Sequence, residues 1–141
     1  MERALMSWSG GKDSALALAE VRTRRSLDVV ALLTTVTQDY GRVSMHGVRR
    51  TLLKAQADAL GLPLVEVSIT RDATNEEYET SMARTLSASK EAGVATVVFG
   101  DLFLEDLRAY REEKLRRADL RAVFPIWKSD PERLARRFIA A

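Results

Sequence analysis

The sequence predicts an α/β fold, a three-layer α/β/α sandwich in which helices cover both faces of a mainly parallel sheet. Short apolar runs alternate with longer helical stretches, and the connections are long enough for crossovers between parallel strands. Residues 29–36 (VVALLTTV) are almost continuously apolar and β-branched, which is typical of a strand covered on both faces. With 141 residues, close to the roughly 150 of a typical domain, we expect a single domain over residues 1–141.

The elements of the first half follow from apolar patterning and from residues that end helices. Leu16, Leu18 and Val21 lie in the helical stretch that follows the first apolar run. Gly61 ends the next helix, and Pro63 begins the strand after it. The expected order is a strand at 4–8, a helix at 12–25, a strand at 29–36, a polar loop at 37–44, a helix at 52–60 and a strand at 64–69.

The second half continues the alternation. Either Thr74 or Asn75 caps the next helix, and Gly93 ends it. The ligand crevice of an open parallel sheet lies at the carboxyl ends of its strands, where the polar clusters at 7–14, 34–46 and 100–108 fall. The expected elements are a helix through about residue 92, a strand at 94–99, a charged helix at 105–118, a short run at 122–127 and a helix from about Pro131.

Composition excludes several classes of function. Basic residues number 22 and acidic residues 20, so no charge surplus indicates a nucleic-acid-binding face. Cysteine is absent, which excludes disulfides, thiolate metal sites and sulfur transfer through a protein persulfide. No apolar stretch is long enough for a membrane span, and the amino-terminal residues lack the apolar core of a signal peptide. We therefore expect a cytoplasmic protein that does not contact the membrane.

The strongest motif is Ser9-Gly10-Gly11-Lys12-Asp13-Ser14, where the first strand turns into the first helix. Two glycines let the backbone approach a ligand, and the amides at a helix start attract an anion. The serines add hydroxyl donors, Lys12 a cation and Asp13 a carboxylate for Mg²⁺. The motif fits neither a Walker A loop nor a G-x-G-x-x-G fingerprint. The alternative interpretation is a Ser/Gly turn before an Asp-capped helix.

Residues 9–14 resemble the pyrophosphate-binding SGGxDS loop of the PP-loop ATP pyrophosphatases, within the adenine nucleotide alpha hydrolase superfamily. Later motifs resemble the diphthine-ammonia ligase-like branch of that superfamily. These are residues 45–48 (MHGV), 56–57 (QA), 60–64 (LGLPL), 75–78 (NEEY), 99–101 (FGD), 105–111 (EDLRAYR) and 124–127 (FPIW).

The resemblance implies a Rossmann-like sandwich of about five strands that binds ATP and Mg²⁺ and cleaves ATP between its α- and β-phosphates. Pyrophosphate would lie on Gly10, Gly11, Asp13 and Ser14, and Asp13 would bind the metal. Adenine would lie against the backbone of residues 33–35. The expected nucleotide-binding residues are Ser7, Trp8, Ser9, Gly10, Gly11, Lys12, Asp13, Ser14, Leu33, Thr34, Thr35 and Gly100.

Further polar residues are candidates for catalysis or acceptor binding, each with a simpler interpretation. His46, the single histidine, would otherwise be a surface or capping residue, and Asp101 would cap a helix. Glu105 and Arg108 share a helix face, but the many charges around them are typical of a solvent-exposed face. Gln56 is either a satisfied polar core group or a substrate contact, and the sequence favours neither. The expected catalytic residues are Lys12, Asp13, His46, Asp101 and Arg108. The expected acceptor-binding residues are His46, Gln56, Asn75, Tyr78, Asp101, Glu105 and Arg108, with His46, Asp101 and Arg108 converging beside the phosphate loop.

The leading hypothesis is an ATP-dependent ligase that adenylates a carboxylate or similar acceptor and then amidates it, as diphthine-ammonia ligase does. The alternatives are a module that holds ATP or AMP without chemistry, as universal stress-like proteins do, and a PP-loop adenylase that modifies tRNA. Relatives commonly continue past the helix containing Leu134 and Phe138, so we expect a segment of the site to be missing. An apolar edge left by that segment would favour a homodimer.

Overall fold

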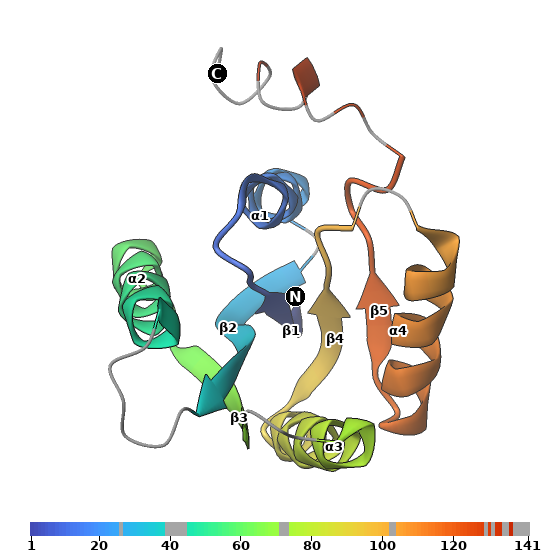
Figure 1. Ribbon diagram of the computed structural model, residues 1–141. Coiled ribbons are helices and arrows are strands. Elements are labelled where there is room, and N and C mark those ends of the chain that lie inside the picture. Colours follow the sequence, from blue (N-terminus) through green and yellow to red (C-terminus); the bar gives the residue numbers. More distant parts are fainter. Residues whose placement is uncertain are drawn as a thin grey trace.

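The computed structural model describes residues 1–25, 27–38, 45–70, 74–101 and 104–128, with single positions at 130, 132, 133 and 136. Side chains are described for these residues except 36–38, 45–49, 69 and 70. The elements, drawn in Figure 1, are β1 (Glu2–Ser7), α1 (Lys12–Arg24), β2 (Leu27–Gln38), α2 (Met45–Leu60), β3 (Leu64–Thr70), α3 (Asn75–Glu91), β4 (Val94–Val98), α4 (Glu105–Arg117) and β5 (Arg121–Val123).

The strands form one parallel sheet in the order β3-β2-β1-β4-β5. The chain runs outward from β1 to β3 and then returns to the other side of β1 to form β4 and β5. At the centre, Ser7 at the end of β1 pairs with Leu33 of β2, and Met6 pairs with Val98 of β4. The reversal between β1 and β4 is the switch point at which such sheets bind ligands.

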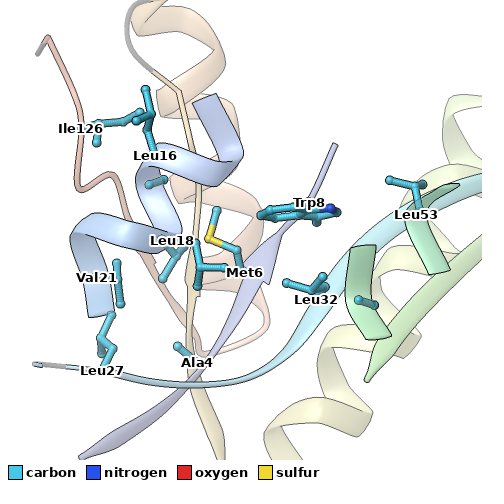
Figure 2. Packing of buried hydrophobic residues seen from close by; sticks show 13 residues of the cluster. Ala4, Met6, Trp8, Leu16, Leu18, Val21, Leu27, Leu32, Leu53 and Ile126 are labelled. Atoms are coloured by element: carbon cyan, nitrogen blue, oxygen red, sulfur yellow. The ribbon is translucent and has the colours of Figure 1, made fainter. Parts of the chain in front are cut away.

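Helices cover both faces of the sheet, which confirms the predicted three layers (Figure 1). Side chains alternate along β1, so Ala4 and Met6 pack with α1 and α2, whereas Leu5 packs with α3 and α4. Figure 2 shows Met6 beside Leu18 of α1 within the first of these clusters. Each fully buried leucine in such a core contributes about 1.5–3 kcal/mol.

Several boundaries differ from the sequence-based expectations. β2 extends beyond 29–36 at both ends. α2 begins at Met45 rather than at 52, directly after the loop expected at 37–44. The first turns of α2 carry polar residues such as Arg50, which is exposed, so the apolar pattern starts later than the helix does. β5 ends at Val123 because Pro125 cannot donate to a strand ladder, and residues 125–128 form turns instead. The helix expected from Pro131 falls almost wholly outside the described residues.

Thr74, not Asn75, caps α3. Its side-chain Oγ1 accepts a hydrogen bond from the amide of Glu77 at 3.2 Å. This bond satisfies one of the amides left unpaired at a helix start. It decides between the two capping residues that the sequence allowed.

Candidate functional site: a phosphate loop beside a charged cavity

The loop after β1 folds back on the start of α1. The Ser14 hydroxyl accepts a hydrogen bond from the Ser9 amide at 3.3 Å and lies 3.0 Å from the Ser9 hydroxyl. The Ser9 hydroxyl in turn accepts from the Gly11 amide at 3.3 Å. Gly10 has φ of 83°, a left-handed conformation that favours glycine. Both serines of the motif therefore help to shape the loop.

Gln56 of α2 supports this loop from outside the cavity. Its Oε1 accepts a hydrogen bond from Trp8 Nε1 at 3.0 Å, and its Nε2 donates to the Gly10 carbonyl at 3.4 Å. A Cβ at Gly10 would lie 2.9 Å from Gln56 Oε1. The side chain is therefore a satisfied polar group that positions the loop, the first of the two interpretations that the sequence left open.

The start of α1 presents backbone amides without a side-chain cap. Gly11 is the N-cap, with φ of −90° and ψ of 176°, and no side chain makes the capping hydrogen bond. A Cβ at Gly11 would meet only Ser9 Oγ, at 3.5 Å, so the space beside it is open. Amides and the helix dipole make this terminus suited to an anion. Lys12 is exposed and does not line the cavity described below.

Gly100, two residues after β4, lies against the backbone of the same helix start. A Cβ at Gly100 would lie 2.9 Å from the Asp13 carbonyl oxygen and 3.0 Å from the Ser14 nitrogen. No larger residue fits there without moving one of the two segments. Gly100 therefore serves close packing between β4 and the phosphate loop.

A cavity of about 480 Å³ opens beside the loop, on the side of the sheet that α3 and α4 cover. Residues at the end of β1, in the second half of β2 and at the end of β4 form one wall, and α3 and α4 form the other. The lining residues are Ser7, Trp8, Ser9, Asp13, Ser14, Leu33, Thr34, Thr35, Tyr78, Met82, Leu86, Val97, Phe99, Gly100, Asp101, Tyr110, Arg111, Lys114 and Leu115.

The charged side chains of the cavity differ in how they are paired. Asp13 Oδ1 is buried and has no hydrogen-bond partner. Asp101 Oδ2 and Arg111 Nε lie 2.7 Å apart as an ion pair without the angle of a hydrogen bond, and the Arg111 guanidinium lies 4.6 Å from the ring centre of Phe99. Lys114 Nζ lies 3.2 Å from Glu79 Oε1, and this contact lowers the pKa of Glu79 below its usual 4.5.

The site contains one carboxylate suited to a metal carried by phosphates. Within the described ranges, no group of three or more histidine, aspartate or glutamate side chains converges. Mg²⁺ commonly binds through one or two carboxylates together with substrate phosphates and water, which a single Asp13 would satisfy. Its buried and unpartnered Oδ1 fits that role, because burial of an unpaired carboxylate oxygen is costly.

The structure gathers some of the predicted residues and separates others. Among the predicted acceptor-binding residues, Tyr78 and Asp101 line the cavity, whereas Asn75 and Glu105 are exposed elsewhere, with Glu105 Oε1 3.4 Å from Lys128 Nζ. His46 lies in the first turn of α2, and its side chain falls outside the described residues. Gly10, Gly11 and Lys12 of the predicted nucleotide-binding set are not among the cavity-lining residues and lie in the adjoining turn and helix start. The members of the set that line the cavity are Ser7, Trp8, Ser9, Asp13, Ser14, Leu33, Thr34, Thr35 and Gly100.

Arg108 does not converge on the phosphate loop, which corrects the sequence-based expectation. Its guanidinium lies over the rings of Phe124 and Trp127, at 4.6 and 4.9 Å, and its Nε contacts Glu112 at 2.9 Å. These rings hold the guanidinium, and Arg108 is not among the residues that line the cavity described above. Arg111, one turn further along α4, contacts Asp101 instead.

Lys114 also lines the cavity, and the sequence did not indicate it. The available signal was its spacing from Arg111. Residues three apart share a helix face, so a cavity-facing Arg111 would place Lys114 at the cavity as well. Among the charges of α4, however, that spacing did not separate a cavity-facing residue from a solvated one.

These features define a parallel α/β domain with an anion-binding loop at the switch point of its sheet, the architecture of a nucleotide-binding domain. The chain belongs to the diphthamide synthase N-terminal domain family, whose family model matches residues 1–122. This membership places the chain among ATP-utilising proteins of the PP-loop type.

No curated protein gives a significant match. A crystal structure of a protein from the universal stress protein family of Burkholderia pseudomallei is 18% identical, with 87% of this chain and 94% of that chain covered and a TM-score of 0.45. No helix among the described residues is long and apolar enough to cross a membrane.

Proposed function

We propose that this protein binds ATP with Mg²⁺ in the cavity, cleaves it to AMP and pyrophosphate, and transfers the AMP to a carboxylate acceptor that is then amidated. The observation that carries the proposal is the buried, unpartnered Oδ1 of Asp13, a cavity residue in the first turn of α1, the helix whose N-cap Gly11 has no side-chain cap. A carboxylate in that environment needs a cation, and phosphates seated on the adjacent amides would bring one.

The loop would hold the departing pyrophosphate. Its donors are the amides at the start of α1, where the helix dipole stabilises negative charge. Asp13 would hold Mg²⁺, which supplies Lewis-acid stabilisation of the phosphate oxygens when it is bound. The adenine end would lie along Leu33, Thr34 and Thr35, which line the same cavity.

The proposed reaction has two steps. An acceptor carboxylate oxygen attacks the α-phosphorus, the bond from that phosphorus to the bridging oxygen breaks, and pyrophosphate leaves with both bonding electrons. Ammonia then attacks the acyl carbon, loses a proton and expels AMP, which leaves an amide. Preorganised donors aimed at the developing charge are the main means by which such a site would accelerate the first step.

The test is incubation of the protein with ATP, Mg²⁺ and a panel of carboxylic acids with ammonium, followed by separation of the nucleotides. We expect AMP and pyrophosphate in equal amounts, dependent on one class of acid. ADP as the main product would contradict the proposal. Tight ATP binding without turnover, in the presence of every acid tried, would favour a non-catalytic nucleotide-binding module.

A further inference from the structure

Lys114 is a cation held at the edge of the cavity by three neighbours. Its side chain is 16% exposed, and its Nζ lies 5.4 Å from the ring centre of Tyr78 and 5.3 Å from that of Tyr110. Two aromatic faces at these distances stabilise an ammonium group and restrict where it points. Lys114 therefore presents a fixed positive charge to the cavity wall opposite the phosphate loop.

Glu79 is the counter-ion of this ammonium group. Its carboxylate is 39% exposed, accepts a hydrogen bond from the Tyr110 hydroxyl at 3.3 Å and lies 3.2 Å from Lys114 Nζ. An ion pair with one exposed partner contributes little to stability, because water competes with it. Glu79 can therefore be replaced, as the partner of Lys114, by a better-placed anion at a small cost in free energy.

Arg111 differs from Lys114 in this respect. It contacts Asp101 at 2.7 Å, and that carboxylate is only 19% exposed. It also lies against the Phe99 ring. A less exposed carboxylate and a buried ring therefore hold Arg111, whereas the partner of Lys114 is open to solvent.

We propose that Lys114 binds an oxyanion of the cavity's ligand, and that Glu79 pairs with Lys114 only until this oxyanion displaces the Glu79 carboxylate. Lysine binds phosphate and carboxylate oxygens as a point charge. The oxyanion is a nucleotide phosphate or the acceptor carboxylate. This inference rests on the proposal that the cavity binds a nucleotide and its acceptor.

The experiment measures binding by calorimetry for the wild type, Lys114→Met and Glu79→Gln, with Mg·ATP, AMP and inorganic pyrophosphate as separate probes. A further arm titrates malonate, a carboxylate probe, into protein saturated with AMP. We expect Lys114→Met to weaken at least one probe by about tenfold, the loss of one charge-assisted contact. Glu79→Gln should strengthen the same probe by about threefold, because the competing anion is removed.

Arg116→Met is the matched control. Arg116 lies on the same helix and carries the same charge, but it is 75% exposed, pairs with Glu113 and does not line the cavity. Its loss should change every affinity by less than about twofold, which separates position from net charge. Lys114→Arg should restore part of the affinity lost in Lys114→Met.

The arms distinguish the source of the oxyanion. If Lys114→Met weakens the binding of ATP and AMP but not of pyrophosphate, Lys114 contacts the α-phosphate. If the variant weakens the binding of malonate alone, Lys114 contacts the acceptor. Failure of the wild type to bind any nucleotide would overturn the proposed function, while the malonate arm, run without AMP, would still test Lys114. Affinities unchanged in both Lys114→Met and Glu79→Gln, for probes that the wild type binds, would overturn the inference. If Lys114→Met does not fold, Glu79→Gln still decides it.

Discussion

The backbone of Gly100 lies against the backbone of Asp13, so closely that a Cβ at Gly100 would stand 2.9 Å from the Asp13 carbonyl oxygen. The end of β4 and the first turn of α1 thus touch without an intervening side chain. This contact lies at the switch point between β1 and β4, where the cavity opens.

We expect Gly100→Ala to move the first turn of α1 and to weaken ATP binding as well as stability. The added methyl group meets backbone atoms, which cannot rotate away, so the free energy of unfolding should fall by about 1–3 kcal/mol. Urea unfolding and calorimetry with Mg·ATP measure the two effects. Unchanged stability together with unchanged affinity would show that the contact does not constrain the site.

Substitution of Gly11 should affect binding far more than folding. Its φ of −90° suits any residue, and a Cβ there would meet only Ser9 Oγ at 3.5 Å. The loss of glycine at an N-cap costs stability of the order of 1 kcal/mol or less. We expect Gly11→Ala and Gly11→Val to fold and to bind ATP progressively more weakly, since their side chains occupy the space proposed for phosphate. A folded Gly11→Val protein with wild-type ATP affinity would contradict the placement of the phosphates at this loop.

Asp13→Asn should leave stability almost unchanged while lowering turnover. Asparagine keeps the buried Oδ1 but removes its negative charge, which lowers the cost of burying it, and it also loses a favourable charge in the first turn of α1. Because these effects oppose each other, we expect the free energy of unfolding to change by less than about 1 kcal/mol. AMP production should fall more than ATP affinity, because the metal matters most as charge develops on pyrophosphate. A large loss of stability with wild-type turnover would make Asp13 a structural residue.

The position of the loop at residues 9–14 could be predicted from the sequence, because its motif lies in six adjacent residues at a junction between strand and helix that apolar patterning alone locates. The cavity wall from α4 could not. Leu115 is the only residue of that helix that is buried, so the apolar pattern does not indicate which charged face turns inward.

Arg108 and Arg111 illustrate the consequence. One turn apart, they are equivalent in sequence, yet Phe124 and Trp127 hold the first, whereas Asp101 and Phe99 hold the second. Those partners come from segments outside α4, so only the packed fold distinguishes the two arginines. Gln56 is a similar case, since its role depends on the approach of α2 to the loop.

The ion pair between Glu79 and Lys114 should depend on pH through the pKa of Glu79. Hydrogen bonding to Lys114, together with its charge, holds the pKa of Glu79 below the usual 4.5. The pair should therefore be fully present above pH 4.5 and lost only as pH falls through the lower pKa of the folded protein. Glu79 should thus compete for Lys114 throughout the neutral range.

Carboxyl-carbon NMR titration measures this directly, with Glu113 as an internal control. The pKa of Glu113 is also lowered, chiefly by its hydrogen bond to Arg116 on the same helix. Lys114→Met should move the pKa of Glu79 back toward 4.5 and leave that of Glu113 in place, whereas Arg116→Met should do the reverse. A Glu79 pKa near 4.5 in the wild type, or one that does not respond to Lys114→Met, would mean that the pair does not persist in solution. Glu79 would then not be the anion that a ligand must displace.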